Sequence, residues 1–284
     1  ALEMTTETVI EATEDTFQTD VIDRSRDVPV IVDFWASWCG PCRVLGPVLE
    51  TVAKDYGDEI QLVKIDTETN QKIASHYGIS SIPAVKAFRD GKLIDEFIGA
   101  LPEQEVRAFF NRIRPSEADN LTLEGEAELS IGNMEAARVL FEEAVSADEN
   151  HPGATLGLAS VLVDVGELDR AEELVGRASN TERAKQLSAQ INLLRAAANQ
   201  DKATLENRIS SNESDIEARY LLGALLLSVS EWENGFEHLL EVMIGDRKFA
   251  DDGARKLILD GLELLGPNHP LTSEYRRRLT NLLF

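Results

Sequence analysis

Residues 30 to 42 are Val-Ile-Val-Asp-Phe-Trp-Ala-Ser-Trp-Cys-Gly-Pro-Cys, and this stretch carries the strongest indication of the fold. It opens with an apolar run that suits a short strand buried on both faces. The cysteine pair, Cys39 and Cys42, ends the stretch. A helix is expected from 44 to 56, where apolar residues recur one turn apart and Gly57 follows. The sequence therefore predicts a strand, a cysteine-containing turn and a helix in direct succession.

The surrounding residues 8 to 113 alternate strand and helix signals, which is the order expected of an α/β domain. Residues 28 to 35 and 60 to 65 are short apolar runs typical of buried strands. Residues 84 to 88 and 93 to 98 flank an Asp-Gly pair, which is a strong hairpin signal. A final helix is expected to lay one apolar face on the sheet through Val106, Phe109, Phe110 and Ile113.

The rest of the chain has a different character, because strand signals disappear after residues 114 to 118, which we interpret as a linker. Residues 119 to 284 are expected to form an all-α domain. Within it, the segment 132 to 137 recurs as 166 to 171, an offset of 34 that matches the tetratricopeptide period. A third copy is centred on residues 223 to 235. The pattern predicts tetratricopeptide-like helical repeats, and a plain helical bundle is the alternative.

Two stretches follow the repeat period less closely. Residues 180 to 212 are interpreted as a degenerate unit that is four residues short of a full repeat. Residues 250 to 284 are expected to form a further helix pair, because the open end of a helical array must be covered.

The strongly negative net charge of the chain excludes some classes of binding partner. The chain has 28 Lys and Arg against 51 Asp and Glu, a net charge of −23 that repels phosphate backbones and anionic lipid surfaces. We therefore expect no nucleic-acid or membrane partner. Residues 1 to 7 lack the features of a secretory signal, and no run of about 18 apolar residues occurs. A cytoplasmic protein is expected, with Met4 as the native start within an N-terminal tail and Ala1 to Glu3 as added residues.

A Cys-x-x-Cys pair serves either as half of a zinc site or as a dithiol–disulfide couple. Cys39 and Cys42 are the two cysteines of the chain, and its histidines are scattered without paired spacing, at His76, His151, His238 and His269. We therefore expect a redox pair, no metal and no separate cofactor. Because the dipole and free amides at the start of a helix stabilise a thiolate, Cys39 is predicted to be the nucleophile and Cys42 the resolving thiol.

Asp33 is a further candidate catalytic residue, because a carboxylate inside an apolar strand must lose its water. One interpretation is a buried ion pair with Lys64, which lies at the equivalent place inside the next strand. The other is proton acceptance from Cys42 during thiol–disulfide exchange. The two interpretations are compatible, so both Asp33 and Lys64 are predicted to belong to the site.

Over residues 8 to 113 the chain resembles thioredoxin. The resemblance is carried by the run from Asp33 to Cys42 together with Pro47, Lys64, Ile82, Pro83, Gly91 and Gly99. It implies a thioredoxin fold in which Pro83 is a cis proline facing the disulfide. It also implies a shallow apolar surface for an extended client segment, formed by Trp38, Ile82, Pro83, Ile98, Gly99 and Ala100. The departures from the family pattern, Arg43 and Ala84, remove no chemical role.

The whole chain resembles the bacterial chaperedoxin (CnoX/YbbN) family, in which a thioredoxin domain precedes tetratricopeptide-like helices. The resemblance implies a stress-response chaperone with thiol–disulfide oxidoreductase activity. Such a protein holds unfolding or oxidised clients, keeps their cysteines reduced and passes them to the GroEL chaperonin, with thioredoxin reductase as a further candidate partner. The alternative is a dedicated protein-disulfide reductase whose helical repeats select substrates.

By the same resemblance, the C-terminal helix is the contact with the chaperonin. It combines an apolar stripe at helical spacing with three consecutive arginines, and both features suit a docking helix. Capping of the repeat array is the simpler interpretation of the same stripe. The residues assigned to partner binding are Tyr275, Arg276, Arg277, Arg278, Leu279, Leu283 and Phe284.

Overall fold

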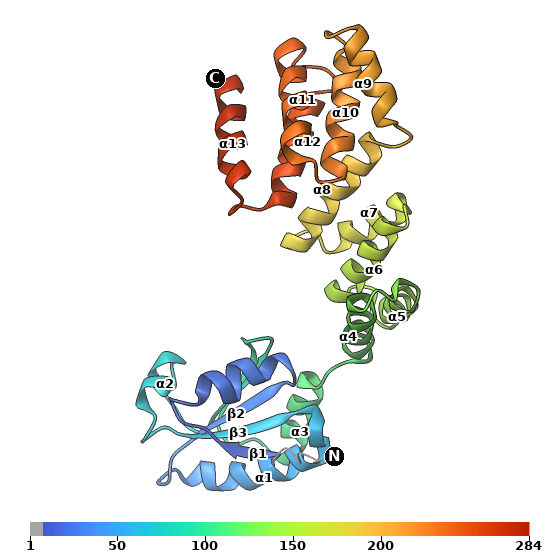
Figure 1. Ribbon diagram of the computed structural model, residues 1–284. Helices are drawn as coiled ribbons and strands as arrows, with labels where there is room; N and C mark the ends of the chain where they lie inside the picture. Colours follow the sequence, from blue (N-terminus) through green and yellow to red (C-terminus); the bar gives the residue numbers. More distant parts are fainter. Residues whose placement is uncertain (1–7, 284) are drawn as a thin grey trace. The chain divides into compact units, whose positions relative to one another are not determined.

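The computed structural model describes residues 8 to 283, and the chain divides into two compact units on either side of the bond between Ser116 and Glu117 (Figure 1). Each unit has hydrophobic clusters of its own, so each has the core that an independent domain needs. The tail expected over residues 1 to 7 and the assigned partner-binding residue Phe284 lie outside the described residues.

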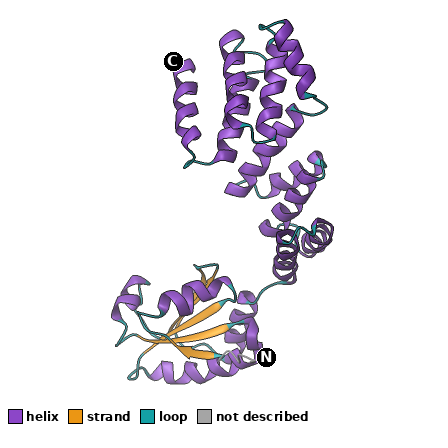
Figure 2. Cartoon of the chain, in the orientation of Figure 1, coloured by secondary structure: helices purple, strands orange, loops and turns teal. Residues whose placement is uncertain are grey.

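The first unit is built on a five-stranded mixed sheet in the order β1-β3-β2-β4-β5 (Figure 2). β2 pairs in parallel with β3 on one side and antiparallel with β4 on the other, which places β2 at the centre. A central strand is covered on both faces, and this explains the continuous apolar run in its sequence. The strands are β1 (Val9–Glu11), β2 (Val30–Trp35), β3 (Gln61–Asp66), β4 (Ala84–Arg89) and β5 (Lys92–Ile98).

Helices cover both faces of this sheet (Figure 1). α1 and α3 pack on one face, whereas η1 and α2 pack on the other. Successive residues of β2 point to opposite faces, so Ile31 packs against α1 and α3 while Val32 packs on the far side. The helices are η1 (Gln18–Asp23), η2 (Arg24–Arg26), α1 (Gly40–Tyr56), η3 (Gly57–Glu59), α2 (Gln71–His76) and α3 (Glu103–Ile113).

The α/β fold class predicted for this unit is confirmed. The predicted hairpin joins β4 to β5, and Asp90 and Gly91 at its turn have positive φ angles of 52° and 75°, as a two-residue hairpin turn demands. The predicted apolar face of α3 is fully buried. The helix expected to begin at residue 44 begins at Gly40 instead, because Cys39 caps it and Pro41 is compatible with its first turn.

The described part of the second unit consists of ten helices, and its all-α character is confirmed. α4 begins at Glu117, so the last two residues of the stretch expected as a linker are helical. Acidic residues in the first turn complement the helix dipole and Ala118 is buried, and both favour a helix from Glu117 onward. The helices are α4 (Glu117–Ser130), α5 (Met134–Ala147), α6 (Pro152–Asp164), α7 (Leu168–Arg177), α8 (Glu182–Ala196), α9 (Lys202–Ser211), α10 (Ile216–Ser228), α11 (Trp232–Gly245), α12 (Gly253–Leu265) and α13 (Pro270–Leu283).

Glycines at equivalent places let these helices approach one another. A Cβ atom added at Gly125 or Gly157 would lie 2.8 Å or 2.5 Å from the ring of Phe141, which fills the space between α4, α5 and α6. In the third copy, a Cβ atom at Gly223 would lie 2.7 Å from the side chain of Leu239. Leu239 therefore occupies the position that Phe141 has in the first copy.

The turns inside the three copies also share one geometry. Gly132 and Gly166 each have a φ of 81°, and Ser230 takes the same left-handed region at 65° without being a glycine. In every copy, the next backbone N–H donates to a carbonyl of the preceding helix five residues back, at 2.8 to 2.9 Å. This matching geometry marks the three copies as one repeated helix–turn–helix unit.

Candidate active site

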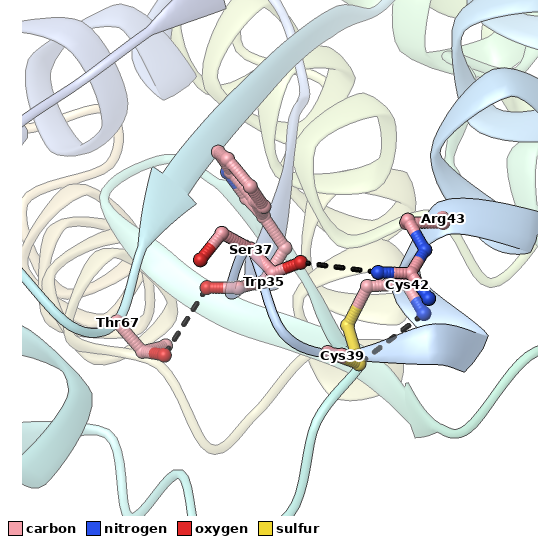
Figure 3. The surroundings of a disulfide bond; sticks show 6 residues. All are labelled: Trp35, Ser37, Cys39, Cys42, Arg43 and Thr67. Carbon is pink, nitrogen blue, oxygen red and sulfur yellow. Dashed lines mark hydrogen bonds between the residues drawn. A yellow bond between two sulfur atoms is a disulfide. The ribbon is translucent and has the colours of Figure 1, made fainter.

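A disulfide joins Cys39 and Cys42 where β2 gives way to α1, and the Cα atoms of the two residues are 5.3 Å apart (Figure 3). Cys39 is the N-cap residue of α1, and its Sγ accepts a hydrogen bond from the backbone N–H of Cys42 at 3.2 Å. Pro41 stands in the first turn, where a helix has no use for its missing N–H. The helix therefore offers a free amide and its positive end to the sulfur of Cys39, the surroundings that stabilise a thiolate.

Both cysteines are buried in this disulfide form. The exposed fraction of Cys39 is 3%, against 5% for Cys42, so burial does not distinguish the two residues. Both belong to a small apolar cluster with Ala36, against which Trp35 and Ile82 pack. What distinguishes Cys39 is its place at the N-cap of the helix.

The loop that precedes Cys39 is held at two carbonyl groups (Figure 3). The guanidinium of Arg43 donates to the carbonyl oxygen of Ser37 at 3.4 Å, and the hydroxyl of Thr67 donates to that of Trp35 at 3.1 Å. Arg43 belongs to α1 and Thr67 follows β3, so two separate elements fix the path of this loop. These two contacts fix the backbone that leads to the sulfur of Cys39.

The segments predicted to bind an extended peptide meet near the disulfide. The Ile82–Pro83 peptide bond is cis, as the resemblance implies. The backbone N–H of Gly99 donates to the carbonyl oxygen of Pro83 at 2.8 Å, which brings the end of β5 to the proline. Trp38 and Ile98 are 67% and 62% exposed, so both present apolar surface to the solvent. The structure thus brings together the predicted residues Ile82, Pro83, Ile98, Gly99 and Ala100.

Asp33 lies on β2 and faces α1. It is 2% exposed, and its Oδ1 atom has no hydrogen bond partner among the described residues. Burial raises the pKa of Asp33 to about 7, because loss of water penalises the carboxylate more than the positive charge of Lys64 stabilises it. The carboxyl group therefore gains or loses a proton near neutral pH.

Asp33 and Cys42 both line one cavity of about 240 Å³. A cavity of this size that is lined in part by charged side chains admits water, so a proton has a route between the two residues. The lining residues come from β2, β3 and α1, and they are Asp33, Trp35, Cys42, Arg43, Gly46, Pro47, Glu50 and Lys64.

The predicted ion pair between Asp33 and Lys64 is wrong. The two residues are side by side in the register of β2 and β3, yet the Nζ atom of Lys64 lies 2.7 Å from Oε1 of Glu50 on α1. The ammonium group also lies 5.5 Å from the ring centre of Trp35. Glu50 was not among the predicted site residues. Its spacing of four and eight residues from Gly46 and Cys42, which puts all three on one helix face, is the signal that could have found it.

Known proteins are similar in sequence to the first unit. A thioredoxin family model matches residues 8 to 112. Thioredoxin 1 of Synechococcus elongatus is 46% identical over 91 residues, which are 32% of this chain and 83% of that protein. The thioredoxin of Porphyra purpurea is 43% identical over 104 residues, or 37% of this chain and 95% of that protein. The chain belongs to the thioredoxin family.

The second unit adds a different family to this thioredoxin domain. Two tetratricopeptide repeat models match residues 129 to 198 and 195 to 284. The repeats predicted from the offset of 34 are therefore confirmed in preference to a plain bundle. The protein is a thioredoxin domain joined to tetratricopeptide repeats.

The thioredoxin family works through a redox-active disulfide and uses no separate cofactor. In the range from residue 8 to residue 283, no group of three or more His, Cys, Asp and Glu side chains is arranged to hold a metal ion. No helix in the described part of the chain has the length and apolar character needed to cross a membrane.

The apolar stripe of α13 is buried in the second unit. Tyr275 and Leu279 are 1% and 5% exposed, and the Tyr275 ring lies 4.6 Å from that of Phe236 on α11. Half-buried Leu283 packs against the same cluster. The assignment of Tyr275 and Leu279 to a partner surface is wrong, because both side chains are buried against α11 and α12.

The three arginines of α13 have different surroundings. Arg278 is bound to Glu237 of α11, with its Nη2 atom 2.8 Å from Oε2, and its guanidinium lies 5.0 Å from the ring centre of Tyr275. Arg276 and Arg277 are exposed. Of the assigned arginines, these two offer their charges to the solvent.

Proposed function

We propose that this protein is a thiol–disulfide oxidoreductase that binds unfolding or oxidised client proteins, keeps their cysteines reduced and hands them to the GroEL chaperonin in the cytoplasm. The observation that carries the redox part is the Cys39–Cys42 disulfide at the start of α1, beside the buried and unbonded carboxyl group of Asp33. Joining such a site to tetratricopeptide repeats supports the client-binding part, because repeat arrays offer extended surfaces to other proteins.

The reaction begins from the reduced pair. The Cys39 thiolate, stabilised by the N-terminus of α1, attacks one sulfur of a client disulfide. A bond forms between Cys39 and that sulfur, the client disulfide breaks, and the second client sulfur leaves as a thiolate. Client and protein are then joined by a mixed disulfide.

Cys42 resolves this intermediate. Its thiol gives its proton to the Asp33 carboxylate, and the resulting thiolate attacks Sγ of Cys39. The Cys39–Cys42 bond forms, the bond from Cys39 to the client breaks, and the remaining client sulfur leaves as a thiolate that takes up a proton. Two electrons pass from the cysteine pair to the client, and an external reductant such as thioredoxin reductase must restore the pair.

The client segment is proposed to lie on the apolar surface beside the disulfide. The exposed side chains of Trp38 and Ile98 supply apolar contact, and the backbone near Pro83 and Gly99 supplies polar groups for an extended chain. Such contacts suit many sequences, which a protein acting on varied unfolding clients requires.

The three repeat copies expose apolar side chains to the solvent at the same position of each copy. Ile131, Val165 and Val229 each directly follow the first helix of a repeat, and they are 75%, 49% and 58% exposed. A side chain of this kind at the same turn of three copies supports contact with apolar segments of unfolding proteins. Residues 116 to 284 hold 16 Lys and Arg against 31 Asp and Glu, so basic segments are favoured over acidic ones.

A pull-down with Cys42→Ser tests the redox part of this proposal. The variant retains the nucleophile and lacks the resolving thiol, so clients should accumulate as mixed disulfides on Cys39 that reducing agent releases. Cys39→Ser is the matched control and should trap none. Trapping by Cys39→Ser instead of Cys42→Ser would reverse the assigned roles.

Suppression of aggregation separates the proposal from the alternative of a dedicated reductase. A Cys39→Ser/Cys42→Ser variant should lose insulin reduction and still slow the aggregation of an unfolding client that contains no cysteine. A protein whose repeats only select disulfide substrates would fail this second assay, and that outcome would remove the holding function.

A further inference from the structure

The cation nearest to Asp33 in the sheet is bound to another carboxylate. Asp33 and Lys64 are register partners on β2 and β3, so a lysine side chain aimed along that row would neutralise the aspartate. The ammonium instead lies 2.7 Å from Oε1 of Glu50. Asp33 keeps its Oδ1 atom unbonded among the described residues, although a positive charge lines the same cavity.

The middle of α1 leaves room for this pairing. A Cβ atom added at Gly46 would lie 3.8 Å from the Nζ atom of Lys64, so the lysine head group passes directly beside this glycine. Glu50 follows one turn later on the same helix face and receives it. The Trp35 ring, 5.5 Å from the ammonium, adds a further favourable contact at this position. The space beside Gly46 and the contact with the Trp35 ring together hold the ammonium group of Lys64 beside Glu50.

We propose that Glu50 is a positioning residue for the dithiol reaction: by binding the Lys64 ammonium, it keeps Asp33 free of a cation partner and able to accept the proton of Cys42. This inference rests on the proposed role of Asp33 as the proton acceptor. It assigns to Glu50 the regulation of that same site.

The electrostatic argument takes in each charged or titratable group that lines the cavity with Asp33. Lys64 from β3 carries a positive charge, as does Arg43 from α1; Glu50 from α1 carries a negative one, and Cys42 supplies the thiol. On β4, the residue opposite Asp33 is the apolar Val85. A direct bond from Lys64 would favour the carboxylate and weaken it as a base, whereas Glu50 neutralises the lysine and raises the pKa of Asp33.

Titration of the Asp33 carboxyl carbon by NMR in the reduced full-length protein tests the proposal. Glu50→Gln keeps the size of the side chain and removes its charge, so Lys64 should turn to Asp33 and the pKa of Asp33 should fall toward its ordinary value. The release of a mixed disulfide by Cys42 at neutral pH should slow by about three- to tenfold, because a weaker base accepts the proton less readily. Glu59→Gln, which removes an acid paired with Arg114 outside this cavity, is the matched control and should change neither quantity.

Two further variants separate a positioning role from a structural one. Glu50→Asp retains the charge and should restore most of the Asp33 pKa. In a Lys64→Gln background, Glu50→Gln should shift the pKa of Asp33 much less than it does alone, because the cation that it positions is gone. An unchanged Asp33 pKa in Glu50→Gln, with only a lower melting temperature, would overturn the proposal and leave the pair a structural contact. If Asp33→Asn itself left the release step unchanged, the proposed proton acceptor would fail, whatever the titration of Glu50→Gln showed.

Discussion

Asp33 in the thioredoxin domain and Glu237 in the repeat unit are two carboxyl groups with a basic residue close by and opposite surroundings. Glu237 accepts hydrogen bonds from Nη2 of Arg278 at 2.8 Å and from the Tyr275 hydroxyl at 2.7 Å, and these partners lower its pKa. The pKa of Asp33 is raised, because burial penalises its carboxylate more than the charge of Lys64, which is bound to Glu50, stabilises it. The presence of a nearby cation therefore does not reveal the role of a carboxylate. That role depends on whether the head group of the cation bonds to the carboxylate or to another residue.

The largest effect is expected from Asp33→Asn. Disulfide reduction at neutral pH should slow by roughly 10- to 100-fold, because the acceptor of the Cys42 proton is lost. The same variant should be more stable at pH 8 by on the order of 2 to 4 kcal/mol, because a buried charge without a hydrogen bond is removed. Turnover and denaturant unfolding measured on one sample check both. Loss of stability with unchanged turnover would make Asp33 a structural group like Glu237.

The sign of the pH dependence follows from the raised pKa. Folded Asp33, with a pKa of about 7, holds its proton more tightly than the unfolded chain, where the value is 3.8. Its contribution to stability is thus fully present below pH 3.8 and is lost as the pH rises through about 7. The stability gained by Asp33→Asn should accordingly shrink as the solution is made acidic.

Glu237→Gln should act in the opposite direction and by less. The repeat unit should lose about 1 kcal/mol, since a half-exposed charged hydrogen bond network is broken, and dithiol turnover should be unaffected. The lowered pKa of Glu237 means that this stabilisation is present above its unfolded value of 4.5 and is lost as the pH falls below it. Chemical unfolding at pH 7 and pH 4 measures both, with exposed Glu233→Gln as the control. Equal losses in the two variants would contradict a specific role for the hydrogen bonds that Glu237 accepts from Arg278 and Tyr275.

The smallest effect is expected from the arginines of α13 that Glu237 does not bind. The double variant Arg276→Glu/Arg277→Glu should weaken chaperonin binding by about threefold, because two solvent-exposed charges together contribute less than about 1 kcal/mol. The buried cap made by Tyr275 and Leu279 remains in this variant, so folding is not at issue. Affinity for GroEL can be followed by biolayer interferometry. Undiminished binding at low salt would remove these two side chains from the proposed contact.

Much of the architecture was predictable because it depends on local patterns. The apolar run before Cys39, the Asp-Gly hairpin and the spacing of α3 each specify an element by themselves. The glycines of the repeats specify close helix approach, since no other residue fits against Phe141. The cysteine pair is equally local, because its two residues share one helical turn.

The choice of charged partners was not predictable in the same way. Lys64 could reach Asp33 or Glu50, and the outcome depends on the path of α1 across the sheet and on the space left by Gly46. Arg278 and Glu237 are 41 residues apart, and only the packing of α13 on α11 brings them together. The burial of Cys39 likewise depends on Ile82, which another loop supplies.

The glycine contacts around Phe141 also have a consequence for motion. The ring lies directly against the backbones of two helices, α4 at Gly125 and α6 at Gly157. Because glycine has no side chain, no flexible group at these positions can move aside for the ring. A half-turn of the ring about its Cβ–Cγ bond sweeps out more volume than a close-packed interior leaves, so the helices must separate briefly for each turn. The flip rate of the Phe141 ring can be measured from the exchange of its paired aromatic proton signals. This rate therefore reports how often the helices around the ring separate.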